Sequence, residues 1–136
     1  KKGHIMAFAI AQCTQTNLLA TKSDLEMEMT FLTQELMQLS MQSQAIIEQQ
    51  SQEGQYYMSQ HTDEEGVVDT AAIEYVNSDA FNKKYDALLA EIQAKEQKLQ
   101  VRKQQIELKQ QSISAQEDSW QKLGDKHIQN DFKYGS

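Results

Sequence analysis

Three acidic side chains and a histidine stand together near the middle of the chain, and a metal ion is the ligand that such groups could hold. His61, Asp63, Glu64 and Glu65 precede Gly66. A calcium loop of the EF-hand type needs oxygen ligands at alternating positions before its glycine and a glutamate after it. The alternating positions here are Glu65, Asp63 and His61, so that pattern is absent. We therefore predict a solvated hairpin tip without a metal ion, and a weak metal site is the alternative.

A cysteine and a second histidine are the other side chains that could take part in catalysis. Cys13 is the single cysteine, which excludes an internal disulfide and a zinc site built from several cysteines. We predict that Cys13 is a small residue of a helix seam, and a reactive nucleophile is the alternative. His127 has no nucleophile beside it, and the chain has no phosphate-binding glycine loop, no G-x-S-x-G and no H-E-x-x-H. The sequence predicts no enzyme, no catalytic residue and no cofactor.

The composition limits the kinds of partner that the chain can have. The 136 residues carry a net charge of -7, whereas proteins that bind nucleic acid are usually basic. No stretch approaches the roughly 20 apolar residues that a membrane-spanning helix requires. The mean hydropathy of -0.70 is low for a compact globule and favours an elongated helical protein. We expect neither nucleic acid as a partner nor a membrane span.

The clearest pattern is a spacing of seven residues between large apolar side chains in each half of the chain. A coiled coil buries one such stripe on each helix, and the chain contains no proline that would interrupt it. The predicted seam residues are Leu18, Leu25, Leu32, Leu39 and Ile46 in the first half and Tyr85, Ile92, Leu99, Ile106, Ile113 and Trp120 in the second. They predict an all-α fold in which two long helices pack antiparallel as a coiled-coil hairpin.

A single hairpin domain is expected over residues 6–136, and we interpret residues 1–5 as a remnant of cloning. The expected boundaries are about 7–55 for helix one, about 56–77 for the tip, about 78–123 for helix two and 124–136 for a tail. The chain should turn at Gly66, and the valines and aromatic residues after it favour a short extended piece.

A second, more polar stripe is expected to complete each seam. It comprises Lys22, Met29, Leu36, Ser43 and Gln50 in helix one and Leu88, Lys95, Arg102, Lys109 and Gln116 in helix two. No lysine or arginine stands between Lys22 and Lys83, whereas helix two is rich in lysine. Opposite charges beside a seam favour the packing of the two helices on each other. A turn at Gly66 would set Ile46 opposite Tyr85.

Polar side chains in the seam would leave an isolated hairpin marginally stable. We therefore predict that additional helices come from other copies, in a helical bundle or a filament formed by self-association. The candidate partner contacts are Val101, Leu108, Tyr56, Tyr57, Phe132 and Tyr134.

Three features resemble the small helical-hairpin subunits that type III and flagellar-type secretion systems export. They are the N-terminal stretch A-F-A-I-A-Q-C-T-Q-T-N-L-L-A, the two long heptad helices and the C-terminal end H-I-Q-N-D-F-K-Y-G-S. The stretch Leu99–Leu108 and the closing F-K-Y are also similar to short bacterial coiled-coil proteins. The resemblance implies a self-assembling filament or surface component that is secreted without a cleaved signal. A cytosolic coiled-coil adaptor or secretion chaperone that binds a partner helix is the alternative.

Overall fold

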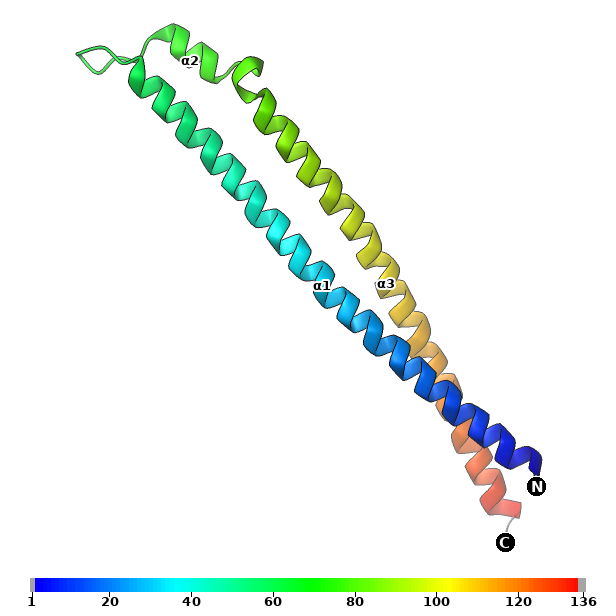
Figure 1. Cartoon of the computed structure of the whole chain (residues 1–136). Coiled ribbons are helices and arrows are strands. Elements are labelled where there is room, and N and C mark those ends of the chain that lie inside the picture. The colour runs from blue at the N-terminus through cyan, green and yellow to red at the C-terminus, as the bar shows by residue number, and fades with distance from the viewer. Residues whose placement is uncertain (1, 135–136) are drawn as a thin grey trace. The chain divides into compact units, whose positions relative to one another are not determined.

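The computed structural model describes the backbone of residues 2–134 and the side chains of residues 3, 5–10 and 12–126. It contains the helices α1 (Lys2–Gln60), α2 (Thr70–Val76) and α3 (Asp79–Tyr134). The two long helices, α1 and α3, pack antiparallel as a hairpin (Figure 1). The all-α hairpin that the heptad pattern predicts is therefore confirmed.

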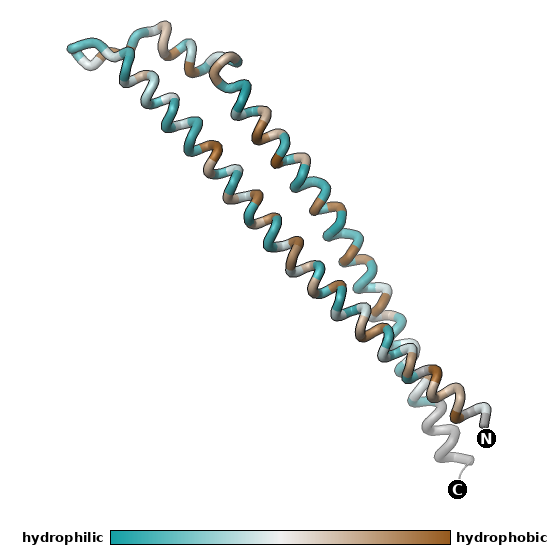
Figure 2. The backbone as a smooth tube through the Cα atoms, viewed as in Figure 1, coloured by the Kyte–Doolittle hydropathy of each residue, from teal (hydrophilic) through white to brown (hydrophobic). Residues whose placement is uncertain are grey.

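The hairpin divides into two compact units, each built from one segment of α1 and one segment of α3. Unit 1 comprises residues 1–32 and 101–136, and unit 2 comprises residues 33–100. Hydrophobic residues recur along both long helices and are separated by hydrophilic ones (Figure 2). Each unit therefore has a narrow apolar seam of its own.

The seam of unit 1 is built from residues of the predicted seven-residue series. Leu25, Leu32, Ile106 and Ile113 are all buried, and Leu18 and Trp120 are half-buried. Two ion pairs cross the seam at its edges, one between Lys22 and Glu117 at 3.6 Å and one between Glu28 and Arg102 at 2.6 Å. Because these pairs are partly exposed, each contributes little to stability, and burial of the apolar side chains holds the helices together.

The Glu28–Arg102 contact perturbs the ionisation of both side chains. The hydrogen bond that the Arg102 guanidinium donates lowers the pKa of the Glu28 carboxyl group from its ordinary value of 4.5. Desolvation opposes this effect, and attraction by Arg102 and by Lys109 adds to it. The same hydrogen bond raises the pKa of Arg102.

The lowered pKa predicts a pH-dependent contribution of Glu28 to stability. A carboxyl group with a lower pKa in the folded chain stabilises the fold above its unfolded pKa, and the contribution disappears as the pH falls through the folded value. Wild type should therefore melt at a higher temperature than Glu28→Gln at neutral pH, and the two midpoints should converge below a pH of about 4. The control Glu26→Gln removes a carboxylate from an exposed position nearby. A difference that stays constant from neutral to acid pH would contradict the role of the ion pair.

Unit 2 buries a more aromatic set of side chains. Ala72, Phe81, Tyr85 and Ile92 are buried, whereas Leu39, Ile46 and Leu99 of the predicted seam are half-buried. Leu39 and Leu99 line a hollow of about 390 Å³ together with polar neighbours. The aliphatic part of this seam is therefore less completely closed than its aromatic end.

Two contacts bear on the predicted alignment of Ile46 with Tyr85 in unit 2. The Gln50 amide donates a hydrogen bond to Asn82, which agrees with that alignment to within one residue. The Tyr85 hydroxyl donates one to the Glu53 carboxylate, so the Tyr85 side chain reaches toward the tip beyond the position of Ile46. In knobs-into-holes packing, a buried side chain fits between four residues of the facing helix and does not meet the equivalent side chain head-on.

The second stripe that the sequence predicts for α3 is wrong. Leu88, Lys95, Lys109 and Gln116 are exposed, whereas the half-buried positions are Leu89, Glu96, Arg102, Lys103, Gln110 and Glu117. Apart from Arg102, the half-buried residues follow the buried series by four positions, whereas the predicted stripe follows it by three. A coiled coil uses both spacings, so the heptad pattern alone does not decide between them. Leucines at both 88 and 89 and basic residues at both 102 and 103 make the two choices look alike in the sequence.

The tip is an ordered turn followed by a short helix. The Asp63 carboxylate accepts hydrogen bonds from the backbone N–H groups of Glu65 and Val67, and Gly66 has a φ of 83°. Glycine adopts this left-handed conformation without steric cost. Thr62 and Val68 form an isolated antiparallel bridge. The turn at Gly66 therefore agrees with the prediction.

The residues after the turn form α2 where an extended piece was expected. The Asp69 carboxylate caps this helix by accepting a hydrogen bond from the N–H of Ala71. The predicted end of helix one near residue 55 is also early, because α1 continues through the buried Gly54 to Gln60. A Cβ atom at Gly54 would lie 3.1 Å from Cγ1 of Val76, so the glycine allows α2 to lie close to α1.

Candidate functional site

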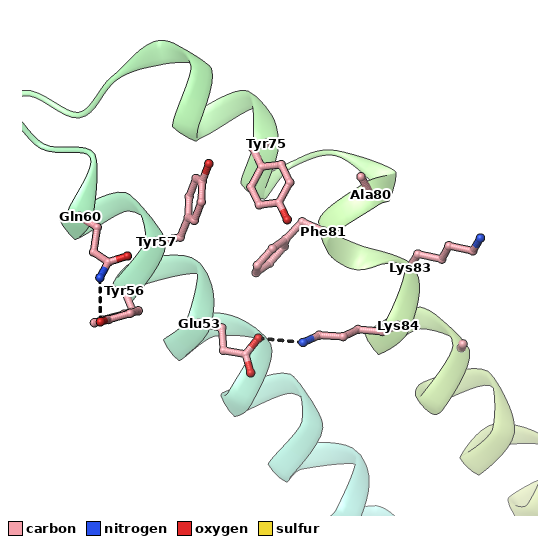
Figure 3. Close-up of a pocket in the computed structure, with 10 residues that line it drawn as sticks. Glu53, Tyr56, Tyr57, Gln60, Tyr75, Ala80, Phe81, Lys83 and Lys84 are labelled. Carbon is pink, nitrogen blue, oxygen red and sulfur yellow. Dashed lines mark hydrogen bonds and ion pairs between the residues drawn. The ribbon is translucent and has the colours of Figure 1, made fainter.

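A groove with a volume of about 740 Å³ lies at the tip of unit 2. We call it the tip groove, and Figure 3 shows its lining. The lining residues are Glu53, Tyr56, Tyr57 and Gln60 of α1, Tyr75 of α2, and Ala80, Phe81, Lys83, Lys84 and Ala87 of α3. All three helices contribute, so the groove exists only because α2 folds back beside the two long helices.

Aromatic rings form a continuous run through the tip groove. Ring centroids are 4.7 Å apart for Tyr57 and Tyr75, 5.6 Å for Tyr75 and Phe81, and 5.7 Å for Phe81 and Tyr85. Such distances are typical of favourable aromatic pairs. Tyr75 remains 40% exposed and Tyr56 65% exposed. The groove therefore offers partly exposed aromatic surface.

The charged groups of the tip groove partly neutralise one another. The Nζ atom of Lys84 lies 3.2 Å from the Glu53 carboxylate and 4.8 Å from the ring centroid of Tyr85. In Figure 3, Lys84 points toward Glu53, whereas the Lys83 ammonium extends away from the groove. With two lysines and one glutamate, the lining has a small positive charge.

The structure gives the histidine and the acidic residues of the tip structural contacts. The His61 ring stacks on Tyr57 at 4.3 Å, and its Nδ1 atom lies 2.8 Å from the Tyr57 carbonyl oxygen. Asp63 uses its carboxylate within the turn. Among the side chains that the structure describes, no group of three or more histidine, cysteine, aspartate or glutamate residues could hold a metal ion.

The tip groove is lined by the aromatic rings of Tyr56, Tyr57, Tyr75 and Phe81. Such a lining can bind an apolar or aromatic side chain.

Cys13 lies on the exposed surface of α1, so its predicted place in the seam is wrong. It lines a shallow hollow with Ala9, Gln12, Thr16 and Asn17. The residue stands five positions before Leu18 of the seven-residue series, so its side chain lies on a different side of α1 from the seam.

Both long helices carry exposed apolar side chains on the faces that point away from the seam. In unit 1, these faces present Val101, which is 53% exposed, and Leu108, which is 66% exposed, on α3, and Met27 and Phe31 on α1. We call Val101, Leu108 and the exposed Ala115 the outward stripe of α3, because they too are spaced by seven residues. In unit 2, α1 exposes Met37 and Met41, each 63% accessible.

The candidate contacts that the sequence predicts fall in different places. Tyr56 and Tyr57 both line the tip groove. Val101 and Leu108 belong to the outward stripe of unit 1. Phe132 and Tyr134 lie outside the side chains that the structure describes. Sequence reasoning missed Tyr75 and Phe81 as groove residues and Met37 as part of an exposed face, whereas Met41 stands out in the sequence as a surplus apolar residue beside the seam.

The total exposed surface is large for the size of the chain. It amounts to 10421 Å², whereas a compact monomer of this mass would expose about 7,200 Å². The excess of roughly 3,000 Å² arises because a hairpin of two helices has no further layer of structure over its outward faces. None of the described helices has an apolar stretch long enough to cross a bilayer. The exposed apolar residues therefore indicate a surface that binds other molecules.

Comparisons of the chain with protein-family models, curated proteins and solved structures found no match.

Proposed function

We propose that the chain is a non-enzymatic structural subunit that self-associates through the outward faces of its long helices. The observation that carries the proposal is the presence of exposed apolar side chains on the outward faces of both α1 and α3. Solvent-exposed apolar patches on a helical protein are typical of surfaces that pack against other helices. The polar residues within the seam supply a further reason, since Lys103 and Gln110 limit the apolar area that one chain can bury alone.

Apolar faces on two helices also favour an open assembly over a closed dimer. In unit 1, Met27 of α1 and Leu108 of α3 both point away from the common seam, so the unit can contact neighbours through two separate faces. Contacts between different faces generate filaments when the rotation between copies does not close a ring. The resemblance to exported helical-hairpin subunits supports a filament or surface component.

Sedimentation velocity over a wide range of protein concentrations tests the proposal. Wild type should form larger species as the concentration rises, and the double variant Val101→Gln/Leu108→Gln should require at least about tenfold more protein. The control Gln100→Ala changes an exposed residue outside the outward stripe and should behave as wild type. A wild-type chain that stays monomeric at every concentration would sink the proposal.

The tip groove supports a second candidate function, that of an adaptor or secretion chaperone which binds a helix of another protein. Residues one turn apart on α1 and on α3 form its two walls, and such a groove suits an amphipathic helix. In that case, the purified chain would be monomeric and a Tyr56→Ala variant would lose the partner without any change in self-association.

A further inference from the structure

We infer that the tip groove of one copy receives the exposed methionine face of α1 from a second copy, an inference that rests on the proposed self-association. The methionine face consists of Met37 and Met41. The tip groove is the host surface and the methionine face is the guest surface. Both belong to unit 2, whereas the outward stripe of α3 belongs to unit 1.

The shape of the tip groove suits a helix as its guest. Its α1 wall is formed by Glu53, Tyr56 and Gln60, and its α3 wall by Ala80 and Ala87 with Lys84 between them. Each wall covers about two helical turns, or roughly 10 Å. The alanines leave room on one side of the groove, and the tyrosines provide contact area on the other.

The methionine face matches the chemistry of the groove. Met37 and Met41 are four residues apart, so their thioethers lie one turn apart on the same side of α1. Thioether sulfur makes favourable contacts with aromatic rings, and methionine adapts to irregular surfaces. The partly exposed rings of Tyr56 and Tyr75 could be covered by these two side chains.

Charge favours α1 over α3 as the guest. From residue 23 to its last residue, Gln60, α1 contains no lysine or arginine, and Glu48 lies on the same side of the helix as the methionine face. The groove lining has a small positive charge, because Lys83 and Lys84 outnumber Glu53, and an acidic guest helix suits it. Residues 79–100 of α3 contain four lysines and four acidic residues, so this helix would bring no net charge to the groove.

Host and guest surfaces lie on different sides of α1. Glu53 and Tyr57 of the groove are half-buried beside the seam, whereas Met37 and Met41 lie on an exposed face. A copy that inserts its methionine face into a neighbour therefore keeps its own groove free for a third copy. Such a heterologous contact propagates and yields an open assembly.

A complementation experiment tests this pairing in full-length chains that also carry Val101→Gln/Leu108→Gln. These two substitutions weaken self-association through the outward stripe of α3, so that the remaining association reports on the tip groove and the methionine face. The groove variant adds Tyr56→Ala, and the face variant adds Met37→Gln/Met41→Gln. All these positions are exposed, and circular dichroism checks that each variant keeps its helices. Each variant alone should associate at least about tenfold more weakly than the background chain. Ile47→Gln, at an exposed position of α1 outside the methionine face, should change nothing.

The mixture of the two variants gives the decisive result. Equimolar groove variant and face variant should form a one-to-one dimer that grows no further, because only one intact host and one intact guest remain per pair. If both variants associate as the background chain does, or if mixing restores nothing, the pairing is wrong while the proposed self-association still stands. If wild type itself never associates, the proposed function fails and the pairing fails with it.

Discussion

Replacing Ile106 with alanine is expected to lower the free energy of unfolding by about 3 kcal/mol, within the range for large-to-small substitutions in a protein core. Ile106 is 0% exposed and lies in the seam of unit 1, where Leu25 and Leu32 are also buried. Removal of its outer carbon atoms would leave a cavity that the helices can close only in part. Urea unfolding followed by circular dichroism, at a concentration where the chain is monomeric, measures the loss.

Leu108→Ala is the matched control for this substitution. Leu108 stands two residues further along α3, yet it is 66% exposed on the outward stripe. Its truncation should change the free energy of unfolding by no more than about 0.5 kcal/mol, as is usual for surface positions. Equal losses for the two variants would contradict the orientation of α3 in unit 1.

The fold could be predicted from the sequence because the buried residues follow one period. Leu25 and Leu32 of α1, together with Tyr85, Ile92, Ile106 and Ile113 of α3, are buried members of the two seven-residue series. A narrow apolar stripe of this period is typical of an α-helix that buries the stripe against another helix. The absence of proline and the turn at Gly66 then predict a hairpin.

Details that depend on a difference of one residue could not be predicted in the same way. The choice between Leu88 and Leu89 as the seam neighbour of Tyr85 depends on the side of α3 that meets α1, and the two leucines do not distinguish the sides. For α2, the β-propensity of Ile73 and Val76 suggested an extended piece. The cap at Asp69 and the burial of Ala72 outweigh that weak preference.

The candidate site could be predicted only in part. The adjacent tyrosines Tyr56 and Tyr57 stand out in the sequence as possible contacts. Their groove neighbours Tyr75 and Phe81 come from two other helices and meet them only when α2 folds back past Gly54. The signal for Met37 and Met41 is that they are apolar residues outside the seven-residue series. A helix of a hairpin buries one apolar stripe, so apolar residues beyond that stripe indicate a second contact face.

The proposed assembly requires α1 and α3 of the same chain to pack on each other, since only then do the outward faces remain free for other copies. Two cysteine pairs test this requirement in a Cys13→Ser chain, one at Glu28 and Arg102 in unit 1 and one at Glu53 and Lys84 in unit 2. The side chains of each pair are in contact, at 2.6 Å and 3.2 Å. A pair at Met27 and Arg102 is the control, because Met27 is 59% exposed on the outward face.

The decisive measurement is cross-linking of these chains by a short bis-maleimide at high dilution, read by denaturing electrophoresis and peptide mass spectrometry. We expect both contact pairs to link almost completely within single chains and to migrate at the monomer mass, while the control pair links poorly. Products of the two contact pairs that run only at the dimer mass would mean that the helices pair between chains, and would contradict the hairpin on which the proposed assembly rests.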